Sequence, residues 1–227
     1  MSTVIISCGR SGTNMALEIL AGHPFFAPSV PEENKRLCKD NVVYGITYLT
    51  KCDTAYMNYE QLRKTLLINP KMKVIWTIRN PKDMAMSKIY RGQPVSEGGD
   101  CKILSDDATF DGCIEDIEKM FNLYKCVIAD FRRRVLLVKM EDIINNIVNE
   151  TEKMCVFLGV SYHEDMINFI GRMRNANKQR YSTIDKNEID KYKNWKTAYD
   201  GFFVKKDYDM DSFFSRLEVY IKYFNYV

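Results

Sequence analysis

The chain has 227 residues, enough for one sizeable hydrophobic core or for one domain with an appended helical segment. Its 46% hydrophobic and 28% charged residues are the fractions of an ordinary soluble globular protein. The net charge of +3 suits a pocket for anionic ligands but does not indicate a nucleic-acid-binding protein, and no apolar run is long enough to span a membrane.

Short apolar runs alternate with amphipathic patterns along most of the chain. The runs that predict strands cover residues 3–7, 42–49, 74–78 and 135–138. The patterns that predict helices cover residues 13–21, 58–68, 82–91, 110–132, 150–158 and 211–223. This alternation predicts an α/β fold of three layers, with a central parallel sheet flanked by helices. We find no repeat and no linker, so we expect a single domain over residues 1–227.

The first predicted strand breaks into a glycine-bearing turn, Cys8-Gly9-Arg10-Ser11-Gly12-Thr13-Asn14, before the first predicted helix. The two glycines permit backbone shapes that other residues resist, and the first amides of a helix point their N–H groups toward an anion. Arg10 adds a positive charge. We expect Thr13 and Asn14 to cap the helix and Gly22 to end it. The turn predicts a phosphate-binding loop.

A second phosphate signal follows the strand predicted at residues 74–78. Arg79 stands at the carboxyl end of that strand, where ligands bind in parallel sheets, and Pro81 suits the first turn of a helix. Ser87 lies about two turns into this helix. An arginine fork and a hydroxyl make a suitable clamp for a phosphate monoester. The alternative is that Arg79 pairs with a carboxylate and that Ser87 packs on the sheet.

These motifs carry a resemblance to the sulfotransferases that use 3′-phosphoadenosine 5′-phosphosulfate (PAPS). The turn at residues 8–14 resembles their 5′-phosphosulfate loop, and Arg79-Asn80-Pro81-Lys82-Asp83 with Ser87 is similar to their 3′-phosphate motif. Lys139-Met140-Glu141-Asp142-Ile143 and Phe157-Leu158-Gly159 resemble two later landmarks, and Lys193-Asn194-Trp195-Lys196 resembles the carboxyl-terminal Trp-Lys segment. The matches occur in the order of the family and span roughly residues 4–196.

The resemblance implies which residues bind the donor PAPS, and that the reaction requires no metal. It places Gly9, Arg10, Ser11, Gly12, Thr13 and Asn14 at the 5′-phosphosulfate, and Arg79 and Ser87 at the 3′-phosphate. The neighbourhood of Trp195 and Lys196 also meets the 3′-phosphate in the family. Lys191 and Lys193 are the nearest basic substitutes for an Arg-Lys-Gly clamp that is not evident here. Met140 replaces a tyrosine that often touches adenine, which leaves the adenine contacts open.

The reaction implied by the resemblance is transfer of a sulfuryl group to a hydroxyl or amine of a small-molecule or carbohydrate acceptor. It needs in-line positioning, charge stabilisation on the leaving phosphate, which Arg10 suits, and a base. The histidine element of cytosolic members is missing, and Lys51-Cys52-Asp53 occupies its interval. We predict Asp53 as the base, with Lys51 assisting the donor. Glu33 and then Glu32 are the alternatives, since carbohydrate-type members use a glutamate earlier in the chain.

Two other functions stay open at this point. A nucleotide or small-molecule kinase has a similar loop, but it needs a lysine after the second glycine, where this chain has Thr13. A non-catalytic nucleotide-binding protein of the same fold is favoured by the missing histidine. Seven scattered cysteines without CxxC spacing and two histidines argue against a zinc site. The scattered cysteines and a first strand that begins almost at Met1 lead us to expect a cytoplasmic protein. The sequence leaves its oligomeric state open.

Overall fold

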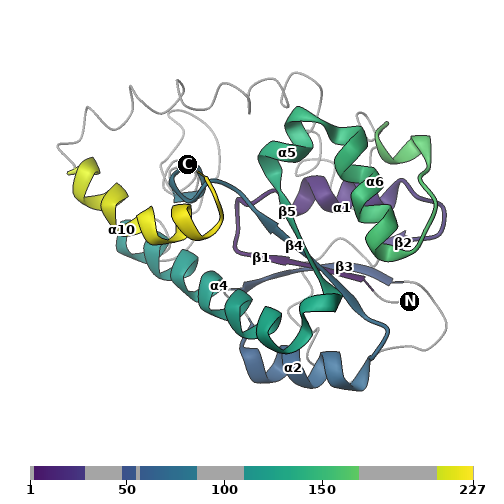
Figure 1. The fold of residues 1–227 in the computed structure, drawn as a ribbon, viewed down its shortest axis with the longest axis horizontal. Coiled ribbons are helices and arrows are strands. Elements are labelled where there is room, and N and C mark those ends of the chain that lie inside the picture. Colours follow the sequence, from purple (N-terminus) through teal and green to yellow (C-terminus); the bar gives the residue numbers. More distant parts are fainter. Residues whose placement is uncertain (1–2, 29–47, 55–56, 86–109, 169–208, 227) are drawn as a thin grey trace, which may run out of the picture.

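A computed structural model describes residues 3–28, 48–54, 57–85, 110–168 and 209–226 (Figure 1). The sheet contains five strands, β1 (Thr3–Ser7), β2 (Ala27–Pro28), β3 (Tyr48–Asp53), β4 (Lys73–Ile78) and β5 (Val135–Lys139). The longer helices are α1 (Thr13–Ala21), α2 (Tyr59–Ile68), α4 (Phe110–Phe131), α6 (Ile147–Leu158) and α10 (Met210–Tyr223). Other described elements are a short helix, α5 (Met140–Asn145), two 3-10 turns (Arg132–Arg134 and Glu164–Met166) and a helical turn at residues 81–85.

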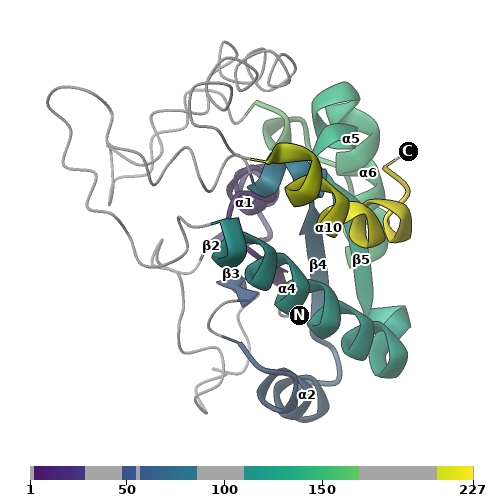
Figure 2. The same ribbon diagram turned by 90° about the vertical axis from the view of Figure 1, so that its left-hand side faces the viewer.

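The strands form one parallel sheet in the order β2-β3-β1-β4-β5, covered by helices on both faces. Figures 1 and 2 show α1, α5 and α6 on one face and α2, α4 and α10 on the other. Alternate side chains of β1 point to opposite faces of the sheet. Ile5 packs in the core under α1, α5 and α6, and Val4 and Ile6 pack in the core under α2, α4 and α10. Every residue of β1 is buried, as expected for a central strand of a doubly covered sheet. The predicted α/β fold is confirmed.

Most predicted elements are confirmed, but some differ, and the short strand β2 was not predicted. The first strand and first helix have the predicted bounds, and Asn58 caps α2 by accepting the Gln61 N–H. The helix expected at residues 150–158 begins earlier, at Ile147. The short helix α5 was not predicted. The strand predicted at residues 42–49 overlaps β3, which continues to Asp53 because its last residues pair with β1.

Arg134 joins the end of α2 to the edge of the sheet. Its guanidinium donates hydrogen bonds to the carbonyl oxygens of Leu66 (2.9 Å), Asn69 (2.8 Å) and Met72 (2.9 Å). We expect Arg134→Met to lower the free energy of unfolding by about 3 kcal/mol, because three partly buried acceptors lose their donor. Urea unfolding would measure this, with exposed Arg133→Met as the control that changes little. Equal midpoints for the two variants would contradict the role of Arg134.

Candidate functional site

The strand order marks the carboxyl end of β1 as the place where a ligand is expected to bind. β3 and β4 lie on either side of β1, so the chain changes direction across the sheet at this strand. In open parallel sheets, ligands bind outside the carboxyl ends of the strands at such a switch point. The loop after β1 is therefore flanked by the end of β3 on one side and the end of β4 on the other.

The loop between β1 and α1 holds two residues in the left-handed region. Gly12 has φ 89°, which suits glycine, and Arg10 has φ 73°, an uncommon conformation for a residue with a side chain. The expected capping by Thr13 and Asn14 is wrong, because Gly12 is the N-cap of α1 and supplies no side chain. The first turn of α1 thus begins without a side-chain cap, so no side chain of the N-cap residue occupies its first amides, as an anion site requires. Gly22 ends α1 as predicted.

Ser11 fixes the loop against the neighbouring strand. Its hydroxyl is fully buried, donates to the carbonyl oxygen of Cys8 (2.9 Å) and shares a hydrogen bond with the hydroxyl of Thr77 on β4 (3.2 Å). The Ser11 side chain is thus engaged within the protein, which leaves its backbone amide as the group for a ligand. Thr77 was not predicted as a site residue, because its contact with the loop spans 66 positions.

Arg79 follows the end of β4 and is buried, with 4% of its surface exposed. The next residue, Asn80, caps the helical turn at residues 81–85. Its side-chain oxygen accepts the Lys82 N–H (3.0 Å), and its carbonyl oxygen accepts the Met84 N–H (2.9 Å). Pro81 takes the first helical position, as predicted. This cap fixes the backbone directly after Arg79 and limits where its guanidinium can lie.

The junction of β5 and α5 contacts both phosphate motifs. Met140 lies beside Gly12, where an added Cβ would be 3.1 Å from the Met140 Cβ. Glu141 accepts the backbone N–H of Asn80 at 2.8 Å. Sequence reasoning treated this segment only as a landmark of the family. In the structure it holds the glycine loop from one side and the Arg79 segment from the other.

The predicted base, Asp53, is the last residue of β3. It pairs in register with Ser7, the last residue of β1, so its backbone lies at the edge of the sheet where the glycine loop begins. Lys51 lies two residues earlier and pairs with Ile5. Both belong to the strand itself rather than to a segment after it, which corrects the predicted boundary at residue 49. The structure brings the backbone of Asp53, but not that of Lys51, to the end of the strand.

The other predicted site residues lie outside the described part of the chain. They are Glu32, Glu33, Ser87, Lys191, Lys193, Trp195 and Lys196. The described site therefore consists of the glycine loop, the Arg79 segment, the β5–α5 junction and the end of β3.

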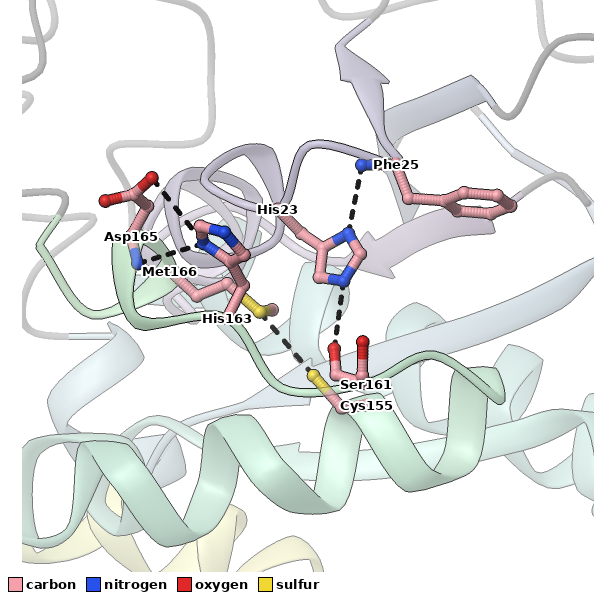
Figure 3. Close-up of polar contacts among 7 residues, drawn as sticks. All are labelled: His23, Phe25, Cys155, Ser161, His163, Asp165 and Met166. Atoms are coloured by element: carbon pink, nitrogen blue, oxygen red, sulfur yellow. Dashed lines mark hydrogen bonds and ion pairs between the residues drawn. The ribbon is translucent and has the colours of Figure 1, made fainter.

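His23 has a structural role at the far end of α1 (Figure 3). Its Nδ1 accepts the Phe25 N–H (3.0 Å), and its Nε2 lies 2.9 Å from the carbonyl oxygen of Ser161. A carbonyl only accepts, so Nε2 carries the proton and both nitrogens are engaged. Nearby, the Cys155 thiol packs on Met166 (3.5 Å), and burial raises its pKa to about 11. This cluster ties α1 to the segment after α6.

Neither a metal cluster nor a spanning helix is found where the structure describes the chain. Across those ranges, no three His, Cys, Asp or Glu side chains are grouped as metal ligands. The expectation that the reaction needs no metal stays a prediction. None of the helices in the same ranges combines the length and the apolar character that crossing a membrane requires.

Comparisons with known proteins identify the family. The family model described as the sulfotransferase domain matches residues 2–217, so the chain belongs to this family and is a sulfotransferase. Comparison with curated protein sequences gives no match.

Solved structures share the fold at low sequence identity. The sulfotransferase domain of the Synechococcus PCC 7002 olefin synthase is 16% identical with a TM-score of 0.58, over 85% of this chain and 87% of that one. Mouse sulfotransferase SULT7A1, solved in complex with PAP, is 17% identical with a TM-score of 0.55, over 96% and 88%. The sulfotransferase domain of the curacin biosynthetic pathway is 13% identical with a TM-score of 0.54, over 74% and 76%. The match to the sulfotransferase family model argues against the kinase alternative.

Proposed function

We propose that this sulfotransferase uses PAPS as its donor and releases adenosine 3′,5′-bisphosphate (PAP). The observation that carries the proposal is the placement of two phosphate-type motifs on adjacent strands, the glycine loop after β1 and Arg79 after β4. The Ser11–Thr77 hydrogen bond joins these two strands at the edge where a ligand binds. Among the structural relatives, the mouse sulfotransferase was solved with PAP. We also propose a single domain over residues 1–227.

In this proposal the glycine loop holds the 5′ side of the donor. The backbone amides of Ser11 to Asn14, with the positive end of α1, bind the 5′-phosphate, and Arg10 neutralises the charge that it gains as the leaving group. Arg10 keeps a left-handed backbone for this purpose, a strain that functional sites commonly store. Arg79 and Ser87 hold the 3′-phosphate. The 3′-phosphate side of the donor is also bound by the segment that contains Lys191, Lys193, Trp195 and Lys196.

The chemistry is an in-line transfer to a hydroxyl or amine. The acceptor oxygen or nitrogen forms a bond to sulfur, the bond between sulfur and the bridging oxygen of the 5′-phosphate breaks, and the electron pair stays on PAP. We propose that Asp53 takes the acceptor proton, because the end of β3 lies beside the loop that holds the leaving phosphate. Lys51 assists the donor, and Glu33 or Glu32 is the alternative base. The acceptor is a small molecule or a carbohydrate.

We expect Arg10→Ala to weaken PAP binding about thirtyfold, because the 5′-phosphate loses a charge-assisted partner. Isothermal titration calorimetry with PAP would measure it, with ATP as a comparison ligand. A wild-type protein that prefers ATP, or an Arg10→Ala variant that binds PAP unchanged, would contradict the donor site. Transfer from radiolabelled PAPS to a panel of phenols, amines and sugars would identify the acceptor class.

We expect Asp53→Asn to lower kcat about a hundredfold while PAP affinity is kept, because only the proton acceptor is lost. Steady-state transfer to an acceptor found in the panel would measure kcat. Glu33→Gln and Glu32→Gln are the matched variants. If one of them loses kcat while Asp53→Asn retains it, the base is that glutamate and not Asp53.

A further inference from the structure

The end of α10 turns back onto the β5–α5 junction. Asn225 takes φ 53°, the N–H of Asn225 bonds to the carbonyl of Lys222 (3.2 Å), and the N–H of Tyr226 bonds to that of Ile221 (3.0 Å). These two bonds and the left-handed residue form a Schellman motif, which fixes the direction of the chain after the helix. Tyr226 thereby projects from α10 toward the segment that holds Arg79.

The hydroxyl of Tyr226 completes a chain of hydrogen bonds that ends at the Arg79 segment. It donates to Oε2 of Glu141 (2.9 Å), and Oε1 of the same carboxylate accepts the backbone N–H of Asn80 (2.8 Å). Asn80 directly follows Arg79 and caps the next helical turn. A carboxylate that is hydrogen-bonded at both oxygens cannot rotate freely. Tyr226 therefore holds the Glu141 carboxylate in the position where it accepts the Asn80 N–H.

Neighbouring charges hold the Tyr226 ring in this place. Lys139 lies with its ammonium 4.4 Å from the centre of the ring and donates to the carbonyl of Asn225 (2.8 Å). Burial, and next the Glu141 carboxylate, raise the pKa of Tyr226, so its hydroxyl stays protonated and remains a donor at neutral pH. The positive charge of the Arg79 guanidinium acts in the opposite direction on the pKa of Tyr226.

The other end of α10 contacts the same segment. The Lys82 ammonium lies 4.9 Å from the centre of the Phe214 ring, in the first half of the helix. Phe213, Leu217 and Phe224 are buried in the core that also contains Met84. Figures 1 and 2 show α10 beside α4 on the same face of the sheet. The helix therefore braces residues 80–84 at both of its ends.

We propose that Tyr226 is a positioning residue for the 3′-phosphate side of the donor site, acting through Glu141 on the Arg79–Asn80 backbone. This inference rests on the proposed function, since it needs Arg79 to meet the 3′-phosphate. It assigns α10 a role in selecting donors that carry a 3′-phosphate over nucleotides that lack one.

The test compares PAP with adenosine 5′-phosphate (AMP), which is PAP without the 3′-phosphate. We expect Tyr226→Phe to weaken PAP binding about fivefold by calorimetry and to leave AMP binding unchanged. Tyr223→Phe on α10 is the matched control, because Tyr223 is exposed and has no hydroxyl hydrogen bond among the described residues. Thermal unfolding of all variants checks that they are folded.

A double-mutant cycle with Glu141→Ala tests the route of the effect. If Tyr226 acts through Glu141, then Tyr226→Phe changes PAP affinity in the wild type and leaves it unchanged in Glu141→Ala. An unchanged PAP affinity in Tyr226→Phe, or an equal loss for PAP and AMP, would overturn the inference while the donor site stands. A wild-type protein that does not prefer PAP over AMP would instead overturn the donor site, and this inference with it.

Discussion

Replacing Arg79 with alanine is expected to lower the affinity for PAP about a thousandfold, equivalent to about 4 kcal/mol. Arg79 is buried at the carboxyl end of β4, with 4% of its surface exposed, and the Asn80 cap fixes the backbone beside it. A guanidinium in such a place forms paired, charge-assisted hydrogen bonds with a phosphate, and each of these contributes about 1.5–3 kcal/mol. Calorimetric titration of PAP would measure the loss.

Two comparisons separate the guanidinium from general effects of charge. Arg79→Lys keeps the charge but removes the planar fork, so we expect it to recover only part of the affinity. Arg63→Ala removes an exposed arginine of α2 that pairs with Asp130, and we expect it to bind PAP like the wild type. AMP binding should be little changed by Arg79→Ala. An equal loss for AMP would mean that Arg79 does not hold the 3′-phosphate.

The sequence is sufficient to predict those parts of the fold that local patterns define. The apolar run of β1 and the amphipathic pattern of α1 give the correct bounds, and the sequence Asn80-Pro81 correctly marks the start of a helix. The predicted capping of α1 by Thr13 and Asn14 failed for a physical reason. A residue without a side chain, Gly12, stands at the N-cap, which agrees with the proposal that the first amides of α1 bind a phosphate.

The missed features depend on contacts between distant parts of the chain. β3 continues through Lys51 and Asp53 because β1 pairs with them, although their polar side chains do not continue an apolar strand pattern. The contact of Glu141 with Asn80 spans 61 positions, and that of Tyr226 with Glu141 spans 85. No spacing rule within one helix or strand reaches that far. The positions of the glycine loop and of Arg79 at the ends of their strands are thus predictable from sequence, while their contacts with distant residues are not.

Gly12→Ala is expected to lower PAP affinity about a thousandfold and the free energy of unfolding by about 2 kcal/mol. Two penalties act together, because Gly12 has φ 89° and a Cβ there would lie 3.1 Å from both the Cβ and the Cγ of Met140. Relief requires the loop to move away from α5, which shifts the amides that we propose bind the 5′-phosphate. Calorimetry with PAP and urea unfolding would measure the two losses.

Gly159→Ala separates backbone strain from crowding. Gly159 ends α6 with φ 75°, and an added Cβ there would have nothing within 4 Å. We therefore expect it to cost about 1 kcal/mol of unfolding free energy and no PAP affinity. A second variant, Met140→Gly combined with Gly12→Ala, removes every Met140 atom that the new Cβ would crowd and should regain part of the lost PAP affinity. If the double variant binds no better than Gly12→Ala, the close approach of α5 does not shape the loop, and the strained backbone alone accounts for the defect.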